Sequence, residues 1–228
     1  MGKIDLNAKL RRAIVDGDGA RAKVLIVAGA SVSMHFSMGE KSRLLADVRP
    51  ETRGLLDGLA LHNITPLHLA AIAGQAEIAQ ILISAGASPK DRGGSCPDDH
   101  SGGLKVQPSA DMDARFGYHP LHYAALADSP DVARVLLAHG ADMEGKAFFH
   151  RRPLHVAYKS RSYEMIRFLV LSGANCRVQA ILPGEAISAL CTGESMKVLQ
   201  EAIREKDWVK WRKKHIALGR RRPGGPSL

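Results

Sequence analysis

Three of the ten histidines stand at matched places in the chain and first suggest a metal site. His68, His122 and His155 each follow a Pro-Leu pair. A metal-bound histidine nitrogen lies about 2 Å from its ion, whereas neighbouring packed helices are about 8–10 Å apart. Histidines at the same point of successive helical units therefore cannot share one ion, and we expect no metal there.

A second group with ligand chemistry is Cys96, Asp98, Asp99 and His100, which lies in a polar stretch. No CxxC or HxxxH pair elsewhere completes a tetrahedral shell, so we expect no metal here either. The chain also lacks the GxSxG nucleophile elbow, the GxxxxGK[ST] phosphate loop and the HExxH zinc motif. We therefore expect no catalytic residue, no cofactor and no enzymatic activity.

The three cysteines are an odd number without a framework spacing, which favours a reducing compartment over a disulfide scaffold. Cys176 and Cys191 lie in or beside apolar helical segments, where we expect buried thiols rather than nucleophiles. The first 19 residues lack the apolar core of a signal peptide, and no apolar run reaches a membrane-spanning length. We expect a cytoplasmic protein, with a nuclear location or delivery into a host cell as alternatives.

The elements that position the histidines are best seen in residues 63–89, which read NITPLHLAAIAGQAEIAQILISAGASP. Pro66 suits the first turn of a helix, and apolar residues then recur with helical spacing. Gly74 and Gly86 each suit the left-handed residue that ends a helix. The stretch predicts two short helices joined by a turn, with an apolar face too large for the pair to bury alone.

The same pattern returns twice, which is the sign of a repeat protein. Pro120 and Pro153 open equivalent Pro-Leu-His segments 33 residues apart, and Gly140 and Gly173 close them with the same spacing. This period and the T-P-L-H-x-A pattern resemble the ankyrin-repeat family. The resemblance implies an all-α solenoid of about five helix-turn-helix units with short β-hairpin or loop connections and two insertions.

Unequal spacing between the units places the insertions. The steps of 57 and 54 residues that flank the second unit exceed 33 by 24 and 21. The expected ankyrin-repeat domain spans about residues 1–205, with units at about 4–33, 60–89, 114–146, 147–179 and 180–205, insertions at about 34–58 and 90–113, and a basic helix and flexible tail at 206–228. The second insertion is too polar to bury a core, so we expect a projecting loop.

The first and fourth units depart from the pattern, and the fifth lacks the Pro-Leu-His motif, which suits a C-terminal cap. The first is a degenerate capping unit, where Asn7 is the expected N-cap of the first helix. In the fourth unit, Tyr158 and Arg161 replace a small residue and the glycine that ends the helix. We expect Tyr158 to fill a gap or lean outward, and the turn at Arg161 to be less relaxed than the turn at Gly74.

The ankyrin resemblance also implies roles for individual residues. In that family the tetrad histidine ties its turn to neighbouring backbone, and the hairpin tips and the first helices form a concave groove for a partner protein. Aromatic and arginine side chains are typical of binding hot spots, although Phe149 can equally pack against the next hairpin. The candidate groove residues are Leu61, His62, Ile64, Ile72, Arg115, Phe116, Tyr118, Leu126, Phe148, Phe149, Arg151, Lys159 and Arg161.

The C-terminal segment carries most of the charge. The whole chain has a net charge of +9, and residues 204–222 hold nine Lys or Arg against two acidic residues. The helical stripe of Trp208 and Trp211 either packs on the last unit or presents a basic amphipathic helix to nucleic acid, an anionic membrane or an acidic partner. The candidate tail contacts are Trp208, Trp211, Lys210, Lys213, Lys214, Arg220, Arg221 and Arg222.

The sequence therefore predicts a monomeric, non-catalytic scaffold that binds a partner protein in its concave groove. The alternative is an adaptor whose basic tail tethers it to nucleic acid or to an anionic membrane surface. Salt distinguishes them, because phosphate binding weakens steeply as salt rises.

Overall fold

The computed structural model describes residues 5–35, 64–93, 117–147, 150–176 and 194–215. These residues form helices, short turns and one isolated antiparallel bridge between Gly93 and Tyr118. The helices are α1 (Leu6–Asp16), α2 (Gly19–Val27), α5 (Pro66–Ile72), α6 (Ala76–Ser84), α8 (Pro120–Leu126), α9 (Pro130–Ala138), α10 (Pro153–Lys159), α11 (Tyr163–Ser172) and α13 (Glu194–His215).

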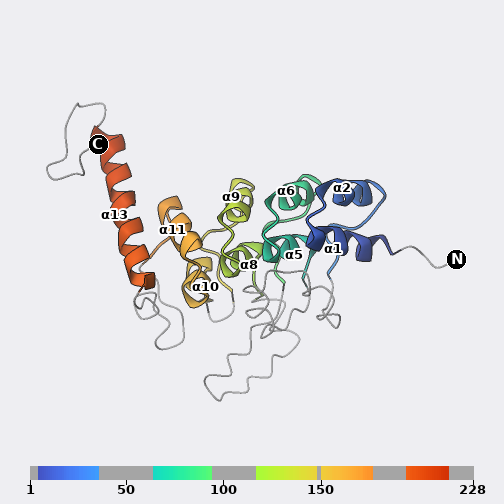
Figure 1. Cartoon of the computed structure of the whole chain (residues 1–228), viewed down its shortest axis with the longest axis horizontal. Coiled ribbons are helices and arrows are strands. Elements are labelled where there is room, and N and C mark those ends of the chain that lie inside the picture. The colour runs from blue at the N-terminus through green and yellow to red at the C-terminus, as the bar shows by residue number, and fades with distance from the viewer. Residues whose placement is uncertain (1–4, 36–63, 94–116, 148–149, 177–193, 216–228) are drawn as a thin grey trace, which may run out of the picture.

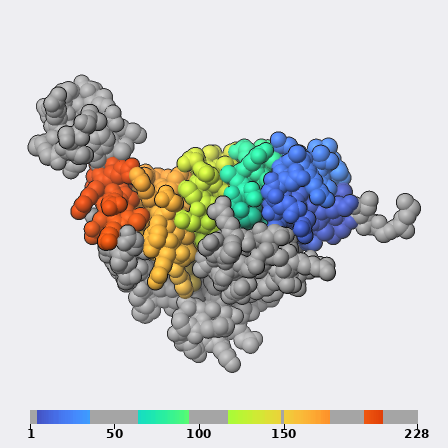
Figure 2. Space-filling model, viewed as in Figure 1, coloured from blue at the N-terminus to red at the C-terminus, as the bar shows by residue number. Residues whose placement is uncertain are grey.

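The first eight of these helices form four antiparallel pairs stacked in chain order (Figure 1). The first helices of the pairs, α1, α5, α8 and α10, contact one another in one row. The second helices, α2, α6, α9 and α11, form a parallel row. Helix α13 packs on α11 and covers that end of the stack. The space-filling view shows the coloured units abutting in chain order (Figure 2).

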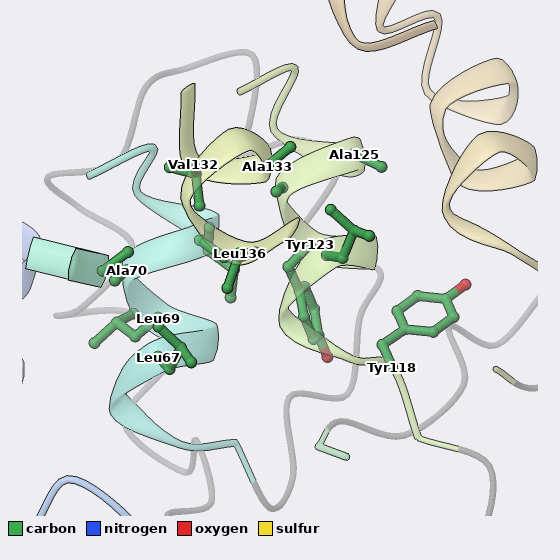
Figure 3. Close-up of a cluster of buried hydrophobic side chains, with 14 of the residues drawn as sticks. Leu67, Leu69, Ala70, Tyr118, Tyr123, Ala125, Val132, Ala133 and Leu136 are labelled. Carbon is green, nitrogen blue, oxygen red and sulfur yellow. The ribbon is translucent and has the colours of Figure 1, made fainter. Parts of the chain in front are cut away.

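The core lies between the two rows and between neighbouring pairs, as the helical spacing predicts. Leu67 and Ala70 of α5 are buried, and so are Val132 and Leu136 of α9. Figure 3 shows these side chains converging from the two pairs, with the Tyr123 ring beside them. Each pair therefore shares its apolar face with its neighbours, which is why a single pair does not suffice.

The first helix of every pair ends at the same register position in the left-handed conformation. The φ angles there are +74° at Gly17, +69° at Gly74, +49° at Asp128 and +56° at Arg161. The left-handed region is unfavourable for non-glycine residues by about 1 kcal/mol. The prediction of a less relaxed turn at Arg161 is therefore confirmed, and Asp128 has the same backbone conformation, which Asp tolerates better than Arg.

The structure corrects the expected N-cap of the first unit and decides where Tyr158 of the fourth unit lies. Asp5, not Asn7, is the N-cap of α1, because the Asp5 carboxylate accepts the N–H groups of Asn7 and Ala8. The Asn7 side chain instead accepts the Ser31 N–H at 2.9 Å and ties the start of the unit to its end. Tyr158 is buried, with 2% of its surface exposed, and does not lean outward.

Helix α13 is longer than the sequence analysis anticipates. The expected boundary at 205/206 between the last unit and the tail falls inside it. No Gly or Pro stands between Glu194 and His215, so nothing in the sequence interrupts the helix. Leu199 and Ala202 are buried on the side that meets α11. Among the described helices, none is long and apolar enough to cross a bilayer.

The helix-ending glycines allow a direct test of the backbone strain. Replacing Gly74 or Gly86 by Ala should each lower the free energy of unfolding by about 1 kcal/mol, because both have positive φ. Gly74→Ala should cost about 1 kcal/mol more, since its Cβ would lie 2.9 Å from Ser129 Oγ, which donates to the Ala127 carbonyl. The measurement is urea denaturation of both variants.

Gly86→Ala is the matched control, because no atom lies within 4 Å of its added Cβ. The extra loss at Gly74 should disappear when Ser129 is also replaced by Ala. Equal losses for the two glycines with Ser129 present would contradict the proposed clash.

Candidate functional site

The tetrad histidines couple neighbouring units through buried hydrogen bonds. His68 Nδ1 accepts the Thr65 N–H at 3.2 Å and lies 2.8 Å from Thr65 Oγ1, which closes the start of α5. His68 Nε2 lies 3.0 Å from the Tyr118 carbonyl oxygen in the next unit. One imidazole thus caps its own helix and holds the following hairpin.

The next unit repeats both backbone contacts of this arrangement. His122 Nδ1 accepts the His119 N–H, and His122 Nε2 lies 3.2 Å from the Arg151 carbonyl oxygen. In the fourth unit, His155 Nδ1 likewise accepts the Arg152 N–H at 3.2 Å. The role that the ankyrin resemblance implies for these histidines, which is to fix the turn to nearby backbone, is what the structure shows.

Each carbonyl that receives a histidine also receives a backbone N–H of the connecting hairpin. Tyr118 O accepts the Gly93 N–H at 2.9 Å, and Arg151 O accepts the Ala147 N–H at 2.8 Å. Both lone-pair directions of the oxygen are therefore used. Tyr118 and Arg151, which directly precede the third and fourth tetrads, are thus each held between a hairpin and the histidine of the preceding unit.

These hydrogen bonds define the charge state of the histidines. Because Nδ1 accepts a backbone N–H, the proton of the neutral ring lies on Nε2, which then donates to the carbonyl oxygen. Burial lowers the pKa of His68 and of His122 from 6.5 to about 3, against a smaller raising effect of the carbonyl hydrogen bonds. The imidazoles are neutral structural donors and do not serve as proton-transfer groups near neutral pH.

Aromatic rings enclose the two coupled histidines. The Tyr118 ring stacks on His122 with centroids 5.2 Å apart, and the Tyr123 ring meets His68 edge-on at 5.6 Å. Tyr123 Oη donates to the Gly93 carbonyl at 3.4 Å, and burial raises the pKa of its phenol. This layer excludes water from the histidines and explains why they stay neutral.

Four of the candidate groove residues are not available at the surface. Ile64, Tyr118 and Arg151 occupy the position directly before the tetrad, and all three are buried. The exposure predicted for these residues is wrong. Tyr118 and Arg151 are held by the hairpin and histidine contacts described above, and Ile64 is buried in the hydrophobic core. Ile72, on the first helix of the second unit, is also buried, with 2% of its surface exposed.

Three candidates remain on the surface of the first-helix row. Leu126 is half-buried, whereas Lys159 and Arg161 are exposed. Ile72, Leu126 and Lys159 share one register position, so exposure there increases along the stack. The other candidate groove residues lie outside the described residues: Leu61, His62, Arg115, Phe116, Phe148 and Phe149.

Two carboxylates that the sequence analysis missed connect the third and fourth units. Asp128 Oδ1 accepts the Met165 N–H at 2.8 Å in the first turn of α11. Glu144 accepts the Asn175 N–H at 2.7 Å and forms an ion pair with Arg152. The signal for Asp128 was present in the sequence, since Asp tolerates a left-handed backbone and is a good helix cap.

The basic C-terminal segment and the cysteines are described only in part. Trp208, Trp211 and the three candidate lysines of the tail lie in α13, but their side chains are not among those described. Residues 216–228, with Arg220, Arg221 and Arg222, lie outside the described residues, as does the Cys96–His100 cluster. Cys176 is half-buried, and burial raises the pKa of its thiol.

No group of three potential metal ligands comes together within the described ranges. What the geometry defines is a helical-repeat solenoid, in which equivalent side chains couple equivalent units. The model of the family "Ankyrin repeats (3 copies)" matches residues 101–180, and the single "Ankyrin repeat" model matches residues 62–93. The chain is an ankyrin-repeat protein, and the predicted all-α solenoid is confirmed.

Curated relatives share parts of this chain. The B-cell lymphoma 3 protein homolog of Mus musculus is 32% identical over 132 residues, which cover 50% of this chain and 30% of that protein. The NF-kappa-B inhibitor cactus of Drosophila melanogaster is 32% identical over 139 residues, 56% of this chain and 26% of that protein. Inversin of Mus musculus is 38% identical over 65 residues, 28% and 6% of the two chains. The chain thus spans less than a third of each of these relatives.

The buried histidines predict a specific loss of stability in mild acid. Below pH 6.5 the unfolded chain binds protons at His68 and His122, whereas the folded chain does not until about pH 3. The free energy of unfolding should therefore fall with pH by roughly 1 kcal/mol per pH unit for each histidine. Urea denaturation at several pH values between about 7 and 5 measures this slope.

Replacing His122 by Gln should lower stability near neutral pH and make the slope shallower by the share of one histidine. Replacing the exposed His139 by Gln is the matched control for the removal of one histidine. A His122 variant with an unchanged slope would show that this ring is protonated in the folded protein.

Proposed function

We propose that this protein is a non-catalytic module that binds a partner protein on the concave face formed by its first-helix row. The observation that carries the proposal is the contrast along that row. The tetrad histidines are buried, and His68 and His122 are bonded to the next unit, whereas the side chains near the helix ends, at Leu126, Lys159 and Arg161, lie at the surface. They stand on a scaffold whose spacing is set by the repeats.

In the proposed mechanism, the stack presents a rigid, preformed surface to the partner protein. A preformed surface loses little conformational entropy when a partner binds, so more of the interaction energy appears as affinity. Repeated units let contacts add along the stack. The similarity to the cactus protein, which is by name an inhibitor of NF-kappa-B, agrees with a role exerted through another molecule.

A second candidate function rests on the charge of the C-terminal segment. Residues 204–222 contribute +7 of the net charge of +9, and α13 is anchored to the stack through Leu199 and Ala202. In this alternative the stack holds a protein while the basic tail contacts nucleic acid or an anionic membrane. Such binding would weaken steeply with added salt.

Affinity capture from nuclease-treated lysate compares the two candidates. The groove variant carries Leu126→Gln and Lys159→Glu, and the tail variant replaces its basic candidates by Gln: Lys210, Lys213, Lys214, Arg220, Arg221 and Arg222. Lys23→Gln, on the outer helix α2, is the control for loss of a single exposed charge. Thermal unfolding verifies that each variant is folded.

We expect a specific protein to be captured by wild type, by the Lys23 variant and by the tail variant, and to be reduced at least about tenfold by the groove variant, since each tenfold corresponds to only 1.4 kcal/mol. Capture that survives the groove changes and disappears with the tail charges would contradict the groove proposal. This result would instead support the alternative in which the basic tail tethers the protein to nucleic acid or to an anionic membrane.

A further inference from the structure

One register position in the stack, the residue that ends the first helix of each unit, carries a side chain in two of the four units. Gly17, Gly74, Asp128 and Arg161 all end the first helix of their unit with positive φ. Glycine adopts this conformation without steric cost, so the first two units need no explanation. The third and fourth units carry residues for which the same backbone is strained.

In the third unit the side chain at this position has a structural role. The Asp128 carboxylate caps the first turn of α11 through the Met165 N–H at 2.8 Å. Burial raises the pKa of this carboxyl group, and the neighbouring Glu164 adds to the effect. The observed role of the Asp128 side chain is therefore to cap α11.

In the fourth unit no comparable structural role of the side chain is found among the described residues. Arg161 is exposed, and among the described residues no hydrogen bond or ion pair holds its guanidinium. Exposed Lys159 stands two positions earlier in α10, and exposed Lys146 and His150 come from the hairpin before that helix. Two acids of the third unit, Asp128 and Glu144, are engaged by the Met165 N–H and by Arg152, respectively.

We infer that Arg161 is a specificity-determining contact for carboxylate side chains in an acidic segment of the partner protein. The inference rests on the proposed groove function and names the chemistry of its ligand. A guanidinium offers a planar fork of donors that matches a carboxylate, and such pairs are stronger than neutral hydrogen bonds. The half-buried Leu126, one unit away, adds an apolar contact for the same segment.

The test uses a random linear-peptide display library selected against the purified full chain. The variants are Arg161→Gly and Arg161→Asn, which both suit the left-handed backbone and remove the charge. Lys23→Gln removes one exposed charge from the outer row and is the matched control. The melting temperature of Arg161→Gly should equal or exceed that of wild type, so lost binding will not reflect unfolding.

Peptides selected by wild type and by the Lys23 variant should be enriched in Asp and Glu, and those selected by both Arg161 variants should not. A synthetic acidic peptide from the wild-type pool should bind Arg161→Gly about five- to tenfold more weakly. Equal Asp and Glu enrichment with and without Arg161 would overturn the inference and leave the groove proposal standing. A wild-type selection without any enriched peptide would count against the groove proposal and the inference together.

Discussion

The stack depends on a neutral imidazole that serves two units at once. His68 and His122 each accept an N–H at the start of their own helix and lie within hydrogen-bonding distance of a carbonyl in the next unit. A buried polar group is costly unless it is paired, and here both ring nitrogens are paired. The same carbonyl also receives the hairpin N–H. Helix start, hairpin and neighbouring unit are therefore fixed by one side chain.

Because of these contacts, the two ends of the first helices α5, α8 and α10 differ. One end carries the buried tetrad, and the other is more exposed. The tetrad end is filled by histidines and by the rings of Tyr118 and Tyr123, and it is closed to a partner. The opposite end finishes in a left-handed residue whose side chain is free to differ between units. The Asp128 side chain caps helix α11, whereas the Arg161 side chain is exposed to solvent.

The fold was predictable because it is encoded locally and repeated. Pro at the start of a helix and a positive-φ residue at its end each have a short-range physical cause, and the 33-residue period then sets their arrangement. Burial of Tyr118 and Arg151 was not predictable in this way. It arises from a carbonyl that receives the histidine of the preceding unit, a contact between residues about 30 positions or more apart. The cap at Asp128 does not follow from the repeat pattern, because the equivalent positions of the other units are Gly17, Gly74 and Arg161.

Coupling of the units through neutral buried histidines is tested most directly by nitrogen NMR of the imidazole side chains. His68 and His122 should each carry a single proton, on Nε2, near neutral pH, and their ring nitrogens should not titrate between about pH 7 and pH 5. A proton on Nδ1 would be incompatible with the N–H groups of Thr65 and His119 that this atom accepts. That result, or titration near pH 6.5, would contradict the inter-unit coupling on which the stack and the proposed binding surface depend.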